Sequence, residues 1–178
     1  MRSYKPLPFT IIDKVFQDYT DVTNYLKNNN QISLLTTAED TFRKALLLSS
    51  ASYFETILQE MISKLAMDKS DSNAMIIAII KQKALSRQYH TWFDWKTPSA
   101  GTFFAMLGED YKSTITAELK SDAEFKECLN SFLEIGATRN LLVHENFAQF
   151  PLQKTMEELY SLYQIAMGFI HHCESTIC

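Results

Sequence analysis

Apolar residues recur three and four positions apart along most of this chain, the spacing that places side chains on one face of an α-helix. Only four Gly and four Pro interrupt the 178 residues, and Val is scarce beside Leu, Ile, Met and Ala. This balance favours helices over strands. The sequence therefore predicts an all-α fold, a single-domain bundle of about five to six helices.

Breaks in the apolar spacing separate the expected helices. Capping-box spacing marks two of the starts, at Thr36–Glu39 and Ser121–Glu124. Pro151 suits the first turn of the last helix. The stretch HTWFDWKTPSAGT at 90–102 has no helical period and contains Pro and Gly, so we expect a loop there. The expected helices cover residues 10–28, about 36–67, about 72–89, about 102–119, 121–147 and 151–173.

Several classes of protein are disfavoured by composition. The longest apolar run is AMIIAII at 74–80, far below the roughly 20 residues that span a bilayer. The N-terminus, MRSYKPLPFT, lacks the apolar core of a signal peptide. Cys128, Cys173 and Cys178 lack metal-ligand spacing and are expected to be free thiols in a reducing cytoplasm. A net charge of −4 argues against broad, non-specific binding to duplex nucleic acid. We therefore expect a cytoplasmic protein with no membrane partner, metal or cofactor.

A polar motif interrupts the apolar stretch ATRNLLVHENF at 137–147. Arg139 continues a stripe with helical spacing, so it is predicted to face the core. Asn140 precedes His144 by four residues and shares its edge of the helix. Gly136 and Ala137 leave the preceding turn without bulk, which would let another helix approach closely. The stripe that leads to Arg139 consists of Phe125, Leu129, Phe132 and Gly136.

A buried arginine needs an anion, since an unpaired buried charge is very unfavourable. Glu55 interrupts the apolar stripe of the second expected helix, as Arg139 interrupts its own. We therefore predict that Glu55 and Arg139 pair. The alternative is that the two form a structural salt bridge with no part in function.

The run TRNLLVHENF resembles the signature of HEPN domains, helical domains of prokaryotic defence and toxin systems. Their motif is an Arg, a polar residue directly after it, and a His four to six positions beyond the Arg, which Arg139, Asn140 and His144 match. The run LLLSSASYFETIL, which contains Glu55, is similar to the second helix of RiboL-PSP-type HEPN proteins. The resemblance implies one HEPN-like domain over 1–178, with an arm at 1–9 and a motif-bearing helix pair at 122–173.

The resemblance also implies an activity. HEPN nucleases cleave RNA without a metal and dimerise, so that two copies of the motif line one cleft. We would then expect a homodimeric toxin or anti-phage effector with RNA as substrate and an antitoxin or defence protein as a candidate partner. Arg139, Asn140 and His144 would be catalytic, Glu55 would support them, and Gly136 and Ala137 would lie at the dimer contact. The alternatives are a non-catalytic HEPN module that binds RNA or nucleotide or mediates dimerisation, and a helical adaptor.

A second segment, KQKALSRQYHTWFDWK at 81–96, interleaves basic and aromatic residues. Such a composition can stack bases and hold phosphates. The alternative is a solvated helix face followed by a loop whose aromatic side chains plug the bundle. The candidate RNA-binding residues in this segment are Lys81, Lys83, Arg87, Trp92, Trp95 and Lys96.

Overall fold

The computed structural model describes residues 9–177, which form an all-α bundle, as the sequence predicts. The one β pairing among these residues is an isolated bridge between Asp94 and Ser99. Most of the predicted arm at 1–9, and also Cys178, lie outside the described residues. The helices are α1 (Ile11–Asn28), α2 (Ile32–Lys69), α3 (Ala74–Ile80), the π-helical turn η1 (Lys81–Leu85), α4 (Tyr89–Trp92), α5 (Gly101–Met106), α6 (Glu109–Ser121), α7 (Ala123–His144) and α8 (Met156–Ile177).

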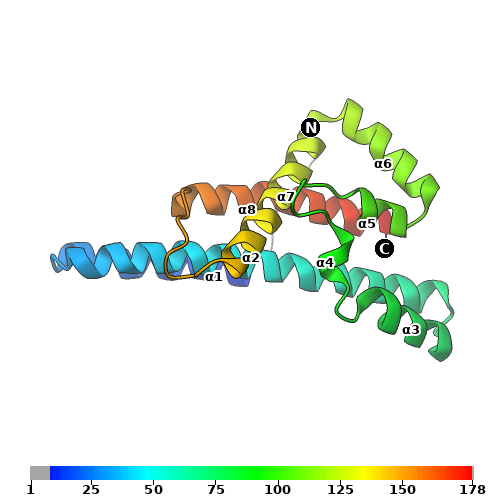
Figure 1. The fold of residues 1–178 in the computed structure, drawn as a ribbon, viewed down its shortest axis with the longest axis horizontal. Helices are drawn as coiled ribbons and strands as arrows, with labels where there is room; N and C mark the ends of the chain where they lie inside the picture. The colour runs from blue at the N-terminus through cyan, green and yellow to red at the C-terminus, as the bar shows by residue number, and fades with distance from the viewer. Residues whose placement is uncertain (1–8, 178) are drawn as a thin grey trace.

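The long helix α2 is the element on which the others assemble (Figure 1). α1 and the first part of α2 form a hairpin that projects at the left of the view, α8 lies along α2, and α7 crosses both. The short elements α3 to α6 follow at the other end. No helix within residues 9–177 combines the length and apolar character needed to cross a membrane.

Aromatic side chains from three helices meet where α7 crosses α2 and α8. The Phe132 ring lies 5.4 Å from Phe54 and 4.8 Å from Phe169, between ring centroids. The Phe54 ring stacks on Tyr163 at 5.7 Å. Such pairs each add about 0.5–1.5 kcal/mol beyond the burial of their area. This cluster fixes the crossing of α7 over α2, which positions the polar motif at the end of α7.

Three of the expected helix starts are wrong. α2 begins before Thr36, whose hydroxyl donates to the Ile32 carbonyl at 3.3 Å as an interior residue. Asp122 rather than Ser121 caps α7, because its carboxylate accepts from the Phe125 amide at 2.9 Å. The last helix begins beyond Pro151, where Thr155 and Glu158 bond reciprocally at 2.7 and 3.1 Å. In each case a nearby polar side chain or an extra helical turn satisfied the backbone groups better.

Two expected helices are interrupted. The segment at 72–89 is a short α3 followed by η1, after which the chain turns at Arg87 with φ 57°. The segment at 102–119 divides into α5 and α6 around Gly108, whose φ of 109° favours glycine. Within the expected loop, α4 forms a single short turn. The apolar period continues through these breaks, which is why it does not reveal them.

The loop after α4 packs directly on α7 at Gly136. A Cβ atom at Gly136 would lie 2.0 Å from Cζ3 of the Trp95 ring. The same ring lies 5.0 Å from Phe93 and 6.4 Å from Phe132, between centroids. The close approach that Gly136 allows is therefore made by Trp95 of the same chain, and not by a second copy as the sequence suggested.

Gly136→Ala is expected to destabilise the fold by about 1–3 kcal/mol, because the added methyl group overfills the contact with Trp95. The sign is informative, since Gly→Ala inside a helix otherwise stabilises by about 1 kcal/mol. Urea unfolding followed by circular dichroism measures the change. Gly101→Ala is the control, since its Cβ would make an ordinary contact, 3.4 Å from Ser99 Oγ. A Gly136→Ala cost that persists undiminished in a Trp95→Ala background would contradict the explanation.

Candidate functional site

The polar motif occupies the last two turns of α7. Arg139 and His144 are exposed, and Asn140 is half-buried. The prediction that Arg139 faces a packed core is wrong, because an open cavity rather than a neighbouring helix lies against this part of α7. Leu142, by contrast, is fully buried and holds the end of α7 against the bundle.

The cavity beside Arg139 has a volume of about 450 Å³ and is bounded by three segments of the chain. α2 provides one wall, the segment from Arg87 to Trp95 provides a second, and α7 closes the third. Charged, amide and aromatic side chains all face it. The lining residues are Ala51, Phe54, Glu55, Gln59, Arg87, Tyr89, His90, Trp95, Phe132, Gly136, Arg139 and Asn140.

Glu55 and Arg139 share this cavity, but no ion pair joins them among the described residues, so the predicted pairing is wrong. Glu55 Oε1 accepts instead from Gln59 Nε2 at 3.2 Å, one turn further along α2. Neither charge is removed from water, so neither requires the other. The carboxylate and the guanidinium therefore both remain available to a bound molecule.

Tyr89 lies within the electrostatic reach of both charges. Burial raises the pKa of its hydroxyl strongly, the Glu55 carboxylate raises it further, and the Arg139 guanidinium opposes them. The hydroxyl is therefore protonated at neutral pH and acts in the cavity as a neutral hydrogen-bonding group.

The segment that carries Tyr89 is positioned by an unusual backbone. η1 closes with a bond from the Ser86 amide to the Lys81 carbonyl at 2.8 Å, and Arg87 then adopts a φ of 57°. Non-glycine residues pay for this conformation, and π-turns recur at functional sites. The turn directs Arg87, Tyr89 and His90 toward the cavity.

The candidate RNA-binding residues at 81–96 do not all lie at the cavity. Trp92 is only 2% exposed, and its indole N–H donates to the Ala84 carbonyl at 3.1 Å. Its ring is therefore part of the core and cannot stack a base. Trp95 is half-buried and faces the cavity, as does Arg87. The exposed side chains of Lys81, Lys83 and Lys96 do not line it.

Besides apolar residues, three cavity residues were not among the candidates from the sequence: Gln59, Tyr89 and His90. Gln59 carried a signal, since it follows Glu55 by four residues and so lies on the same face of one helix. Tyr89 and His90 lie in the basic and aromatic segment at 81–96, but their direction depends on the irregular turn at Arg87, which the sequence does not reveal.

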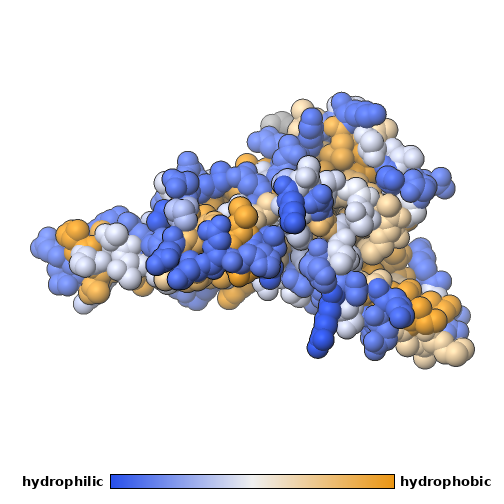
Figure 2. Space-filling view, viewed as in Figure 1, coloured by the Kyte–Doolittle hydropathy of each residue, from blue (hydrophilic) through white to orange (hydrophobic). Residues whose placement is uncertain are grey.

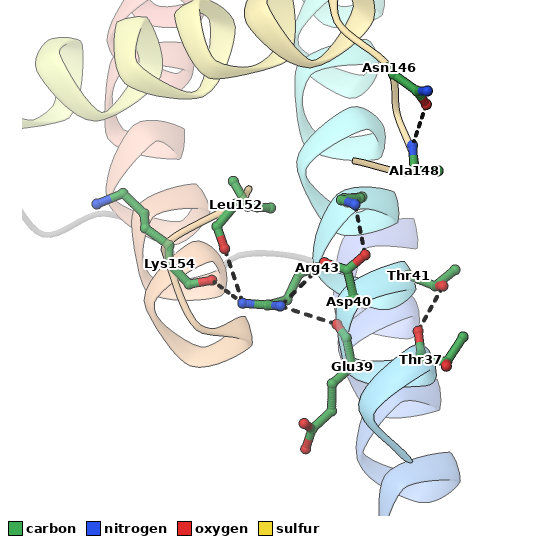
Figure 3. A network of polar contacts seen from close by, with 10 residues as sticks. Thr37, Glu39, Asp40, Thr41, Arg43, Asn146, Ala148, Leu152 and Lys154 are labelled. Atoms are coloured by element: carbon green, nitrogen blue, oxygen red, sulfur yellow. Dashed lines mark hydrogen bonds and ion pairs between the residues drawn. The ribbon is translucent and has the colours of Figure 1, made fainter. Parts of the chain in front are cut away.

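Two neighbouring side chains of α2 contact the segment after His144, and Figure 3 shows the bonds made by the first of them, Arg43. Arg43 donates to the carbonyls of Leu152 and Lys154 at 3.1 and 3.4 Å. The buried Lys44 ammonium bonds Asp40 at 2.7 Å and lies 5.3 Å from the centre of the Phe147 ring. These contacts hold the chain after His144, and the aromatic core fixes α7 before it.

His144 does not line the cavity. The last turn of α7 and the residues that follow it carry exposed apolar side chains around His144. Leu141 is 54% exposed, Val143 48% and Phe147 44%. A single chain thus places Arg139 and Asn140 at the cavity and His144 on an apolar surface beyond it.

Comparison with known proteins places the chain in a family. No curated protein and no solved structure matches it. A family model, described as RiboL-PSP-HEPN, matches residues 13–178. Because the match covers nearly the whole chain, this protein belongs to the RiboL-PSP-HEPN family.

Proposed function

We propose that this protein is a metal-independent endoribonuclease of the HEPN type, which acts as a homodimer in toxin or anti-phage defence. The observation that carries the proposal is the placement of the motif. Arg139 and Asn140 border an open polar cavity, and His144 stands at the exposed end of the same helix among apolar side chains.

The chemistry needs only the groups of the motif. The ribose 2′-oxygen forms a bond to phosphorus while the bond from phosphorus to the 5′-oxygen breaks. A base takes the 2′-OH proton, an acid protonates the 5′-oxygen, and a cation balances the charge on the phosphate. Imidazole serves as base or acid near neutral pH, and the guanidinium of Arg139 fits two phosphate oxygens. Asn140, one turn before His144, orients the imidazole or bonds the phosphate.

One histidine cannot act as base and acid in the same step, which is the reason to invoke two copies. A two-fold dimer through the end of α7 brings two His144 side chains and two Arg139 side chains to one cleft. The exposed Leu141, Val143 and Phe147 surround His144 and would be covered in such a contact. Ala137, half-buried one helical turn earlier, remains a candidate for its edge.

The second candidate function is a non-catalytic module that binds RNA or nucleotide. It is favoured by one observation: the cavity is complete without His144. An antitoxin or defence partner would act in either case by covering the motif.

His144→Ala is expected to lower the rate of RNA cleavage by about 10²–10⁴-fold, the range for a lost acid–base group. Because His144 is exposed, the change should alter stability by no more than about 0.5 kcal/mol. Cleavage of labelled RNA, with mass analysis of the ends, measures the loss. Products should carry a 2′,3′-cyclic phosphate and a 5′-hydroxyl, and EDTA should leave the rate unchanged.

The control for this substitution is His171→Ala, which removes a histidine that lines a different pocket, between α7 and α8. It should retain activity. Expression of the wild-type protein should also arrest growth, and His144→Ala should abolish that arrest. Full cleavage by a folded His144→Ala protein would end the mechanism, and a wild-type protein that cleaves no RNA would favour the binding module.

The protein is expected to be a dimer in solution, with twice the mass of the 20.5 kDa chain by light scattering. Val143→Glu should shift it to monomer and abolish cleavage, because a charge would be buried in the contact. Figure 2 shows a second apolar surface over α3, at the lower right, where Met75 and Ile79 are exposed. Ile79→Glu is therefore the matched control and should leave the dimer intact. Dissociation by Ile79→Glu but not by Val143→Glu would place the interface elsewhere.

A further inference from the structure

The cavity beside the motif contains groups that phosphate chemistry does not use. Glu55, Gln59, Tyr89 and Trp95 neither move a proton in the proposed step nor neutralise a phosphate. A volume of about 450 Å³ falls within the roughly 300–1,000 Å³ of pockets that hold small ligands. An anionic carboxylate on its wall favours a ligand that donates hydrogen bonds.

Glu55 and Gln59 present an ordered row of hydrogen-bonding groups. Both are half-buried and project from one face of α2. Gln59 Nε2 donates one hydrogen to Glu55 Oε1 at 3.2 Å, and it carries a second hydrogen. The carboxylate has further lone pairs on both oxygens. Along this wall, the free Nε2–H of Gln59 is therefore a donor, and the two carboxylate oxygens of Glu55 beside it are acceptors.

Among the RNA bases, the edge of guanine complements that row. Its Watson–Crick edge has an acceptor at O6 followed by two donors, N1–H and the N2 amino group. Adenine and cytosine place an acceptor directly beside their one donor group, and uracil has a single donor between two acceptors. A carboxylate that receives both guanine donors makes a charge-assisted, bidentate contact. Each of the other bases would set a ring nitrogen or carbonyl lone pair against the Glu55 charge.

Two aromatic side chains provide faces for such a base. The Tyr89 and Trp95 ring centroids are 6.1 Å apart, and the rings are tilted by 41°. Trp95 cannot retreat, because its far side rests on the Gly136 backbone and on Phe93. Single-stranded RNA is read in this manner, with an unstacked base held on aromatic rings and bonded at its edge.

Cations complete the site for a nucleotide rather than a free base. Arg87 and Arg139 line the cavity from opposite segments, with His90 and Asn140 beside them. Arginine matches phosphate oxygens with its planar fork. The φ of 57° that directs Arg87 toward the cavity is a backbone cost that a ligand contact explains.

We propose that this cavity is a guanine-nucleotide subsite. Glu55 and Gln59 read the base edge, Tyr89 and Trp95 stack the ring, and Arg87 and Arg139 hold the phosphate. The nucleotide is either a residue of the RNA next to the cleaved bond, which rests on the proposed function, or a free guanine nucleotide.

Calorimetric binding of GMP, IMP, AMP and UMP to the full chain tests the base assignment. GMP should bind about 10- to 100-fold tighter than AMP or UMP, the usual discrimination of a bidentate contact. IMP, which lacks the N2 amino group, should bind more weakly than GMP. Equal affinity for GMP, AMP and UMP would overturn the assignment.

Variants locate the contact. Glu55→Gln should abolish the preference for GMP, since an amide offers one acceptor where guanine needs two. Gln59→Met keeps the side-chain length but removes the donor to O6, so it should weaken the binding of GMP and of IMP, which share O6, and leave the binding of AMP unchanged. Glu60→Gln is the matched control, since this neighbouring carboxylate is exposed and does not line the cavity. A loss of preference in Glu60→Gln equal to that in Glu55→Gln would contradict the site.

RNA oligonucleotides distinguish the two sources of the nucleotide. Oligouridine with a single internal G should be cut beside that G by the wild-type protein, and this preference should vanish in Glu55→Gln. Tight GMP binding without cleavage of any RNA supports the subsite as one for a free nucleotide and contradicts the proposed nuclease. Cleavage with no preference for G and no selective GMP binding leaves the nuclease standing and overturns the subsite.

Discussion

The contact of the Trp95 ring with the bare backbone of Gly136 holds the cavity together. No side chain larger than hydrogen fits between them, since a Cβ would lie 2.0 Å from the ring. The contact anchors the loop that carries Asp94 and Ser99 against α7. It also sets one wall of the cavity, because Tyr89 packs on the other aromatic residues of that loop. A larger side chain at this position would clash with the Trp95 ring and displace the loop that forms this wall.

Helix α2 then fixes the distance between the two parts of the site. Its side chains at Glu55 and Gln59 face the cavity, while Arg43 and Lys44 hold the segment after His144. At a rise of 1.5 Å per residue, Arg43 and Glu55 are about 18 Å apart along the helix axis. One rigid element thus carries both the groups that would read a base and the groups that position the end of the motif.

The residues that resemble the HEPN signature lie in two different environments in this protein. Arg139 and Asn140 border a cavity that one chain completes, whereas His144 lies among apolar side chains that one chain leaves uncovered. The proposed recognition of a nucleotide and the proposed association of two copies would therefore depend on different residues. Exposed apolar side chains around His144 favour association, because contact with another apolar surface removes them from water. The cavity favours a ligand, because its hydrogen-bonding groups and aromatic rings face an open space.

The sequence by itself determined the all-α fold and most of the helices, because the three-four spacing of apolar residues and the shortage of Gly and Pro are local properties. It also singled out Arg139 and Glu55 as candidates, since charges on an apolar stripe are visible without coordinates, and Asn140 and His144 through the resemblance to HEPN domains. Only the tertiary structure decided which of those residues contact one another. The expected ion pair is absent within residues 9–177, because Glu55 and Arg139 line a cavity and the carboxylate bonds Gln59 instead. The direction of Tyr89 and the occupation of Gly136 by Trp95 likewise depend on a turn at Arg87 and on a contact 41 positions apart in the chain. The spacing of apolar residues reveals neither the turn nor the contact. It shows which face of a helix is apolar, but not which distant side chain covers that face.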